Sequence, residues 1–526
     1  MRSAVVVHRW LGVALALVFA LWFLSGIVLM YWGFPEVTER DRLSRAPALD
    51  PVAIRLSAEQ AAASFGDVGF PGDFAREVRL VSADGRPAYD FGASGGRRGS
   101  RLLVFADDGS RPAAVDAQAM DRAAAAWAGR PAGDAAKVVL TEVDQWTVGG
   151  LRGGLPLLKY SWPDGQQVYV SGRTAEIVQY TTRRSRFWAY LGAIPHWLYF
   201  TPLRKHQGEW YSVVVWSSGI GTMAALLGLC IAVAILSPAK RYRHRGRPSV
   251  VPYRRWKRWH TIAGLAFGAV TTTWTFSGLL SMGPFPIVDR FNELVFAARD
   301  ASVPHVRSRI EAVSKDDVEV ALRGIEPPPL SAYQVRPPRE AVVMLGDFEV
   351  KALALTSFDG EPLYVATNGG GETRIVPLHG PVANAIGADR VVSLLRREFG
   401  PRLADLTVLE QYDAYYRDRH RARPLPVVLA RFNDWDHTRL YVDAGTARLV
   451  GSYRGRDWVS RWLYHGLHSL DVPWLYNHRP LWDIVVLALM LGGTALCATS
   501  LVLAWQVVLR KTVRLTQLRM RRARVR

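Results

Sequence analysis

The fold is decided by the stretch HRWLGVALALVFALWFLSGIVLM (residues 8–30), which recurs in altered form as HTIAGLAFGAVTTTWTFSGLLSM (residues 260–282). Each copy opens on a histidine and continues as an apolar run, and the two are 252 residues apart. Identical residues at this spacing are Gly12/Gly264, Ala14/Ala266, Val18/Val270, Trp22/Trp274, Ser25/Ser277, Gly26/Gly278 and Met30/Met282. The chain is therefore an internal duplication.

Further matches follow at a spacing of 272 residues and lead into two more apolar runs. They are Tyr169/Tyr441, Val170/Val442, Thr174/Thr446, Arg184/Arg456, His196/His468, His206/His478, Trp210/Trp482, Gly221/Gly493 and Thr222/Thr494. The spacing grows because the region between the apolar runs is longer in the second half.

Four uncharged stretches divide the chain, and each exceeds the roughly 20 residues needed to cross a bilayer core of about 30 Å. We expect transmembrane helices at residues 11–32, 210–237, 261–284 and 484–509. The remaining segments are then a terminus at 1–10, a domain at 33–209, a loop at 238–260, a second domain at 285–483 and a tail at 510–526. Each half crosses twice, so the two repeats are parallel and related by an approximate two-fold axis along the membrane normal.

The net charge of +20 is concentrated in three segments that contain no acid. Residues 1–10, 238–260 and 510–526 carry two, nine and eight basic residues, and together hold 19 of the 20 net charges. By the positive-inside rule, both termini and the central loop are predicted to be cytoplasmic, with the two domains outside. Attraction to anionic lipid explains these segments, and a nucleic-acid partner is not expected.

The two cysteines, Cys230 and Cys497, both fall within predicted transmembrane helices. The external domains therefore contain no disulfides. The chain has no Cys-x-x-Cys-His motif, so any haem would be held non-covalently.

The external regions have the patterns of mixed α and β structure. Ser57 is a typical N-cap for a helix that begins at Ala58. Strands are predicted at residues 79–81 and 102–105, each followed by an Asp- and Gly-containing turn. The repeated segments 168–178 and 440–450 are predicted to form hairpins closed by small residues.

These features resemble the PepSY-associated transmembrane family, which includes iron-regulated inner-membrane proteins and ferric-siderophore reductases. The resemblance covers most of the chain and rests on His8-Arg9-Trp10-Leu11-Gly12, Trp259-His260, Pro195-His196-Trp197-Leu198, Leu467-His468-Ser469 and the Tyr-Val-x-x-x-Thr-Ala-x-x-Val strand pairs. It implies an α-helical integral membrane protein with two α+β PepSY-like external domains, in a bacterial inner membrane. It also implies two b-type haems.

Membrane topology limits which histidines can cooperate. His8 and His260 open outward-going helices, so both are expected at the cytoplasmic end. The other four, His196, His468, His206 and His478, precede returning helices and are expected at the external end. Because a helix rises about 1.5 Å per residue, most of the bilayer separates the two sets, and one iron cannot join them.

We therefore predict one haem with His8 and His260 as axial ligands. A second haem is predicted with either His196 and His468 or His206 and His478, of which the first pair is preferred as iron ligands. Two imidazoles on one iron suit electron transfer, because no open position remains for oxygen. The small residues Gly12, Gly26, Gly264 and Gly278 would let a flat macrocycle approach the helices, although small residues also favour close helix packing.

The predicted function is electron transfer across the membrane to an external acceptor. By resemblance alone, the acceptor is a ferric siderophore or another ferric chelate, and the enzyme would be a haem-dependent ferric-siderophore reductase. No residue is assigned a catalytic acid or base role. The chain has no dinucleotide-binding motif, so the electron donor would be a quinol or a separate cytoplasmic reductase.

Two alternatives remain at this point. One is a non-enzymatic membrane protein whose PepSY modules bind or regulate an external protein, which would be colourless when purified. The other is a transporter, which is disfavoured because no predicted transmembrane stretch contains an acidic residue.

Overall fold

The computed structural model describes residues 1–64, 78–92, 102–112, 115–150, 154–283, 312–419 and 421–523. The chain forms two compact units. The helical unit comprises Met1–Phe34, Arg184–Ser302 and Arg456–Arg526, and the sheet unit comprises Pro35–Arg183 and Val303–Gly455. Each unit thus takes segments from both halves of the duplication.

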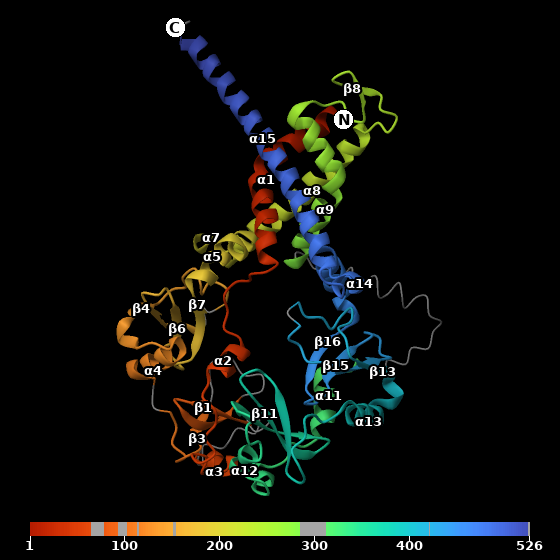
Figure 1. The fold of residues 1–526 in the computed structure, drawn as a ribbon. Coiled ribbons are helices and arrows are strands. Elements are labelled where there is room, and N and C mark those ends of the chain that lie inside the picture. The colour runs from red at the N-terminus through yellow and green to blue at the C-terminus, as the bar shows by residue number, and fades with distance from the viewer. Residues whose placement is uncertain are drawn as a thin grey trace. The chain divides into compact units, whose positions relative to one another are not determined.

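Four long helices build the helical unit (Figure 1): α1 (Arg2–Leu29), α8 (Gln207–Ile235), α9 (Arg255–Ser281) and α15 (Leu481–Ala523). All four are long and apolar enough to cross a membrane, and the candidate span in α15 is Leu481–Arg514. Helices satisfy their backbone hydrogen bonds internally, as a bilayer requires. The chain is therefore a multi-pass membrane protein with four candidate spans, as the sequence predicts.

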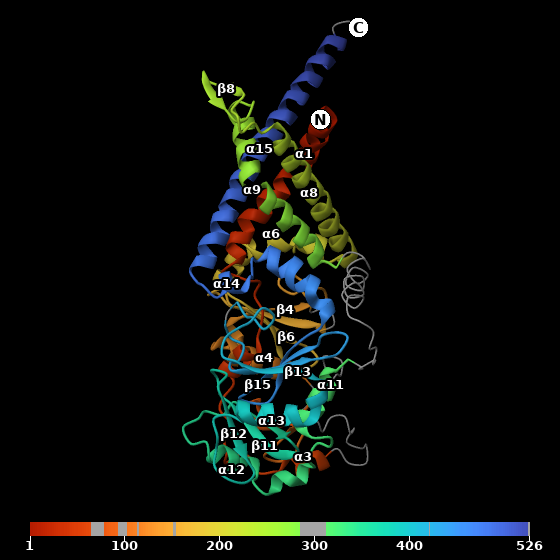
Figure 2. The ribbon, with the colours of Figure 1, turned by 90° about the vertical axis from the view of Figure 1, so that its right-hand side faces the viewer.

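The helices pack as a bundle in which α1 and α9 each contact both α8 and α15. The N-terminus and the C-terminal end of α15 lie at the same end of this bundle, beside the hairpin of β8 (Tyr242–His244) and β9 (Arg247–Ser249) (Figures 1 and 2). Large apolar side chains such as Leu17 and Met223 are exposed on the bundle surface, which suits contact with lipid.

Short helical segments occupy the opposite end of the bundle. They are α5 (Arg183–Leu191), α6 (Ala193–Trp197), α7 (Thr201–Arg204), a π-helical turn (Val459–Gly466) and α14 (Pro473–Tyr476).

The described residues of the sheet unit form three antiparallel sheets. One four-stranded sheet orders β4 (Ala136–Leu140), β5 (Leu157–Ser161), β6 (Gln167–Ser171) and β7 (Ile177–Thr181), and the other orders β13 (Leu403–Leu409), β14 (Val427–Phe432), β15 (Arg439–Asp443) and β16 (Leu449–Tyr453). Ala175 and Ala447 are repeat mates in the β6–β7 and β15–β16 turns, and both have positive φ, at 56° and 50°. The predicted hairpins are confirmed.

The third sheet joins the two halves of the duplication. Its order is β12 (Thr373–Pro377), β11 (Glu361–Thr367), β10 (Ala352–Phe358), β1 (Val78–Ala83), β2 (Arg86–Phe91) and β3 (Leu103–Phe105). The joint is the β1–β10 pair, with Val78 opposite Leu355 and Val81 opposite Ala352. The expected α+β regions are confirmed, and the structure adds that they share this sheet.

Helices of the sheet unit complete its cores. They are α2 (Glu39–Arg45), α3 (Ala58–Ala63), α4 (Ala117–Ala128), α11 (Lys315–Arg323), α12 (Pro338–Val343) and α13 (Ala388–Phe399). Ser57 caps α3 through a capping box with Gln60, which confirms the predicted helix start. Apolar residues from β1, β2, β10 and β11 form one continuous core.

Candidate metal centres

His8 on α1 and His260 on α9 face each other at one end of the helical bundle. Their ring centres are 6.2 Å apart and the ring planes are inclined by 33°. His8 Nδ1 lies 3.0 Å from the carbonyl oxygen of Ala224 on α8. His260 Nδ1 lies 3.2 Å from the Thr499 hydroxyl and 3.3 Å from the Ser500 hydroxyl, both on α15. Since Nδ1 is engaged in both rings, Nε2 is the nitrogen available to a ligand.

His196 and His468 face each other at the opposite end of the bundle. Their ring centres are 6.1 Å apart, and the ring planes are inclined by 67°. Burial, together with the neighbouring His468, lowers the pKa of His196 to about 4. The neutral ring that results is the form that binds a metal.

The second pair is anchored by residues that the duplication repeats. His196 Nδ1 lies 3.1 Å from the Trp22 carbonyl oxygen and 3.2 Å from the Ser25 hydroxyl on α1. On α9, the equivalent partners of His468 Nδ1 are the Trp274 carbonyl at 3.3 Å and the Ser277 hydroxyl at 3.0 Å. A histidine that ligates a metal almost always gives its other nitrogen to such a partner. The duplication shows Trp22/Trp274 and Ser25/Ser277 as repeat pairs, but the sequence alone assigns them no role.

Two further repeat pairs hold the segments that carry His196 and His468. Leu198 and Leu470 both adopt a left-handed conformation, with φ of 52° and 51°, just after the histidines. The Trp210 indole donates a hydrogen bond to the Trp197 carbonyl at 2.8 Å. Its mate Trp482 donates to the Ser469 carbonyl at 3.1 Å. The repeat pair Trp210 and Trp482 is thus bonded to the segments that carry His196 and His468.

Each histidine pair opens onto a cavity within the helical unit. The cavity at His8 and His260 has a volume of about 330 Å³ and is lined mainly by small and aliphatic side chains. The cavity at His196 and His468 has about 290 Å³ and is lined largely by aromatic side chains. Ligand cavities typically fall between about 300 and 1,000 Å³ and are mostly apolar. Phe19 lines both cavities.

Glycines leave room for the rings and for a flat group beside them. A Cβ atom on Gly228 of α8 would collide with the His8 imidazole. A Cβ on Gly26 would approach the His196 ring to 3.3 Å, and one on its mate Gly278 would approach the His468 ring to 3.7 Å. Gly12 has open space around it and lines the first cavity.

The spacing within each pair fits one metal ion between two imidazoles. A metal–imidazole bond is about 2 Å long, and with roughly 1 Å from each nitrogen to its ring centre, the ring centres are expected about 6 Å apart. Both observed spacings agree with this value. Among the described residues, no group of three or more His, Cys, Asp or Glu side chains could hold a metal, so the donor set is two imidazoles. This set fits haem, which supplies its own four equatorial nitrogens.

The two cavities differ in charge. Arg9, Lys257 and Arg510 line the cavity at His8 and His260. The residues described around the other cavity include no charged side chain. That cavity does contain the buried Trp274 Nε1, which has no hydrogen-bond partner within the described part of the chain.

His206 and His478 occupy different surroundings. Both are exposed, and His478 Nδ1 is bonded to the Trp474 carbonyl. Neither appears among the described residues that line the two cavities. The structure thus brings four of the six candidate histidines into two facing pairs and leaves these two on the surface.

The model of the PepSY-associated TM region matches residues 5–506. The chain belongs to this family. Comparison with curated proteins gives no match. The match to this PepSY-associated TM family covers nearly the full length of the chain and includes both histidine pairs.

Proposed function

We propose that this chain transfers electrons across a bacterial inner membrane and holds two non-covalent b-type haems. His8 and His260 would be the axial ligands of one haem, and His196 and His468 those of the other. The observation that carries the proposal is the repeated ring spacing of 6.2 and 6.1 Å, with all four Nδ1 atoms anchored. When bound, haem supplies a one-electron couple between ferric and ferrous iron.

The charge distribution supports an orientation for this path. The His8 end of the bundle carries the N-terminus, the basic hairpin β8–β9 and the basic tail, which the positive-inside rule assigns to the cytoplasm. The donor, a quinol or a cytoplasmic reductase, would then act at the His8–His260 end. The acceptor would meet the His196–His468 end in the periplasm.

The proposed acceptor is a ferric siderophore or another periplasmic ferric chelate, as in the reductases that the sequence resembles. Reduction to ferrous iron weakens the hold of hard oxygen ligands, so the metal is released for uptake. The residues of the chain would contribute position and environment rather than proton transfer. Apolar cavity walls exclude water, and the anchored imidazoles keep each ligand nitrogen directed at its partner.

The test is a reduced-minus-oxidised absorption spectrum of the purified full-length protein, with haem counted by extraction. A b-type spectrum with about two haems per chain is expected, because there are two bis-imidazole sites. A single haem would show that the two-centre path is wrong. A colourless protein would favour the non-enzymatic alternative, a PepSY protein that binds or regulates a periplasmic partner.

The cations at the first cavity lead to a second prediction. Arg9, Lys257 and Arg510 line this cavity and would pair with the propionate carboxylates of a haem bound there. Replacing Arg510 by alanine should weaken retention of that haem by about tenfold, because a hydrogen bond to a charged group contributes about 1.5–3 kcal/mol. Its reduction potential should also fall, since nearby positive charge favours the ferrous state.

Haem retention during dialysis and a redox titration measure these effects. Lys511→Ala is the matched control, because Lys511 lies over the Trp10 ring, 4.6 Å from its centre, and is not among the described residues lining the cavity. Equal behaviour of the two variants would contradict the assignment of Arg510.

A further inference from the structure

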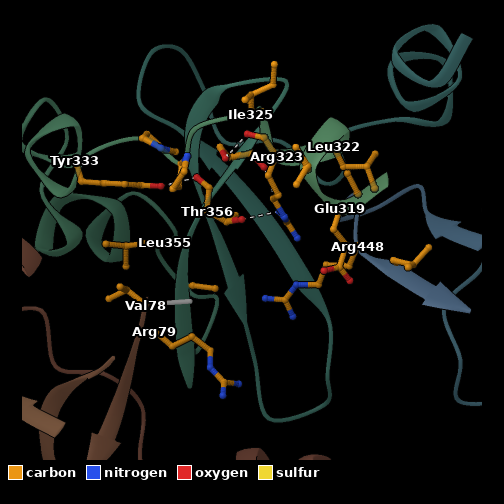
Figure 3. Close-up of a pocket in the computed structure, with 18 of the residues that line it drawn as sticks. Val78, Arg79, Glu319, Leu322, Arg323, Ile325, Tyr333, Leu355, Thr356 and Arg448 are labelled. Atoms are coloured by element: carbon orange, nitrogen blue, oxygen red, sulfur yellow. Dashed lines mark hydrogen bonds between the residues drawn. The ribbon is translucent and has the colours of Figure 1, made fainter. Parts of the chain in front are cut away.

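The sheet unit contains a polar cavity that shares no lining residue with the cavities at the two histidine pairs (Figure 3). Its volume is about 640 Å³, within the range of small-molecule sites. It is lined by residues along α11, the chain that follows α11, strand β10, the β15–β16 turn and the start of β1. All of these belong to one compact unit, so the cavity does not depend on the placement of the helical unit.

Three arginines from different elements line this cavity. Arg323 comes from the last turn of α11, Arg448 from the β15–β16 turn, and Arg79 from β1. Figure 3 shows the guanidinium groups of Arg323 and Arg448 reaching into the same space in front of β10. Two elements far apart in sequence, α11 and the β15–β16 turn, thus bring positive charge to the same part of the cavity, while Arg79 lines another part of it.

Arg323 is held in place by the strand behind it. Its Nη1 donates hydrogen bonds to the Thr356 hydroxyl at 2.5 Å and to the Ser357 carbonyl at 3.1 Å. The Tyr333 hydroxyl donates to the Thr356 carbonyl at 2.5 Å, which fixes the same part of β10. A guanidinium fixed in this way loses little side-chain entropy when a ligand binds.

Acidic side chains offset part of the positive charge. Asp316 and Glu319, both on α11, are the two acids that line the cavity among the described residues. Arg79 also lies 3.6 Å from Glu39, but that carboxylate is 61% exposed, so solvent screens the pair. The lining therefore carries an excess of one positive charge.

The remaining lining narrows the chemical class of the ligand. Guanidinium groups match the planar geometry of carboxylates and can bind them through two parallel hydrogen bonds. Pro327, Pro328 and Leu330 add apolar surface to the lining of the same cavity. The combination favours a compact anion that bears several carboxylates and some hydrocarbon.

We propose that this cavity binds a polycarboxylate anion, in the form of a ferric chelate made by carboxylate ligands. Arg323 and Arg448 bind its carboxylates, and Glu319 limits the affinity. The choice of a ferric chelate rests on the proposed function; the choice of a polycarboxylate rests on the cavity alone. The site would favour anionic chelates over trihydroxamate chelates, in which three ligand charges cancel that of the metal.

The test is isothermal titration of the purified full-length protein with three probes: gallium citrate, citrate alone, and a gallium trihydroxamate chelate. Gallium(III) copies the charge of ferric iron but is not reduced under these conditions, so binding is measured separately from electron transfer. Gallium citrate is expected to bind most tightly. Equal affinity for the trihydroxamate chelate would overturn the anionic site, and equal affinity for citrate alone would overturn the chelate assignment.

Two variants test the charges in opposite directions. Arg448→Gln should weaken gallium citrate binding about tenfold through loss of a charge-assisted hydrogen bond. Glu319→Gln should tighten binding about two- to fivefold by removing a repulsive charge, an outcome that misfolding cannot produce. Arg390→Gln is the control, because Arg390 pairs with Glu361 and is not among the described residues lining the cavity.

Unchanged affinity in both Arg448→Gln and Glu319→Gln would overturn the proposal. The same measurements also distinguish a failure of this proposal from a failure of the proposed function. A colourless protein that still binds gallium citrate would refute the haem assignment and support this site. A protein that holds two haems but binds none of the three probes would support the haem assignment and refute this site.

Discussion

Replacing His8 by alanine is expected to remove one of the two proposed haems, the one assigned to His8 and His260, and to leave the other in place. His8 and His260 form a facing pair, and the alanine would leave that iron with a single protein ligand. The haem content should fall from about two per chain to about one, with the remaining centre still six-coordinate. Haem extraction and the amplitude of the reduced α band measure this change.

The two histidine pairs are far apart along the bundle, so a substitution in one pair should not affect the haem proposed at the other. His8 and Trp22, whose carbonyl anchors His196, lie 14 residues apart on α1, which corresponds to about 21 Å along the helix. His196→Ala should therefore remove only the other haem. His206→Ala is the matched control, because His206 is exposed and should keep both haems. Loss of both haems from His8→Ala would refute the separation of the two sites.

A second large effect is expected from Gly228→Ala on α8. The added Cβ would occupy the space of the His8 ring, with which it would collide. The ring could move aside only by leaving the position that faces His260. Haem affinity at this centre should fall at least about tenfold, comparable to the loss of an outer-shell partner.

The same substitution at Gly219 supplies a control on the same helix. A Cβ at Gly219 would meet only Leu279, at an ordinary 3.9 Å. Both substitutions favour the helical backbone by up to about 1 kcal/mol, so a general change in the stability of α8 would affect the two variants alike. A full complement of both haems in Gly228→Ala would show that His8 does not need its present position.

The duplication allowed much of the scaffold to be predicted from sequence. The apolar runs predicted four membrane helices, and the strand pairs that contain Tyr169 and Tyr441 predicted two hairpins, both of which the structure contains. Symmetry also predicted that His8 would meet His260. Their rings do lie 6.2 Å apart, while the iron between them stays a prediction.

Other features could not be read from the sequence because they depend on contacts between distant segments. The sheet shared by β1 and β10 joins Val78 to Leu355, and no local pattern specifies that partner. The sequence also left two candidate pairs at the external end. Packing of α6 against α1 brings His196 to Trp22 and Ser25, whereas His206 remains exposed at the start of α8.

The sequence by itself determined the membrane spans, the two-fold repeat and the residue types at both ends of the bundle. Hydrophobicity over about 20 residues and the repeat spacing are properties of the chain alone. Only the tertiary structure decided which nitrogen of each histidine is anchored, which glycine faces His8, and that Arg79, Arg323 and Arg448 share one cavity. Such details arise when side chains from separate elements pack together, and sequence spacing does not encode that packing.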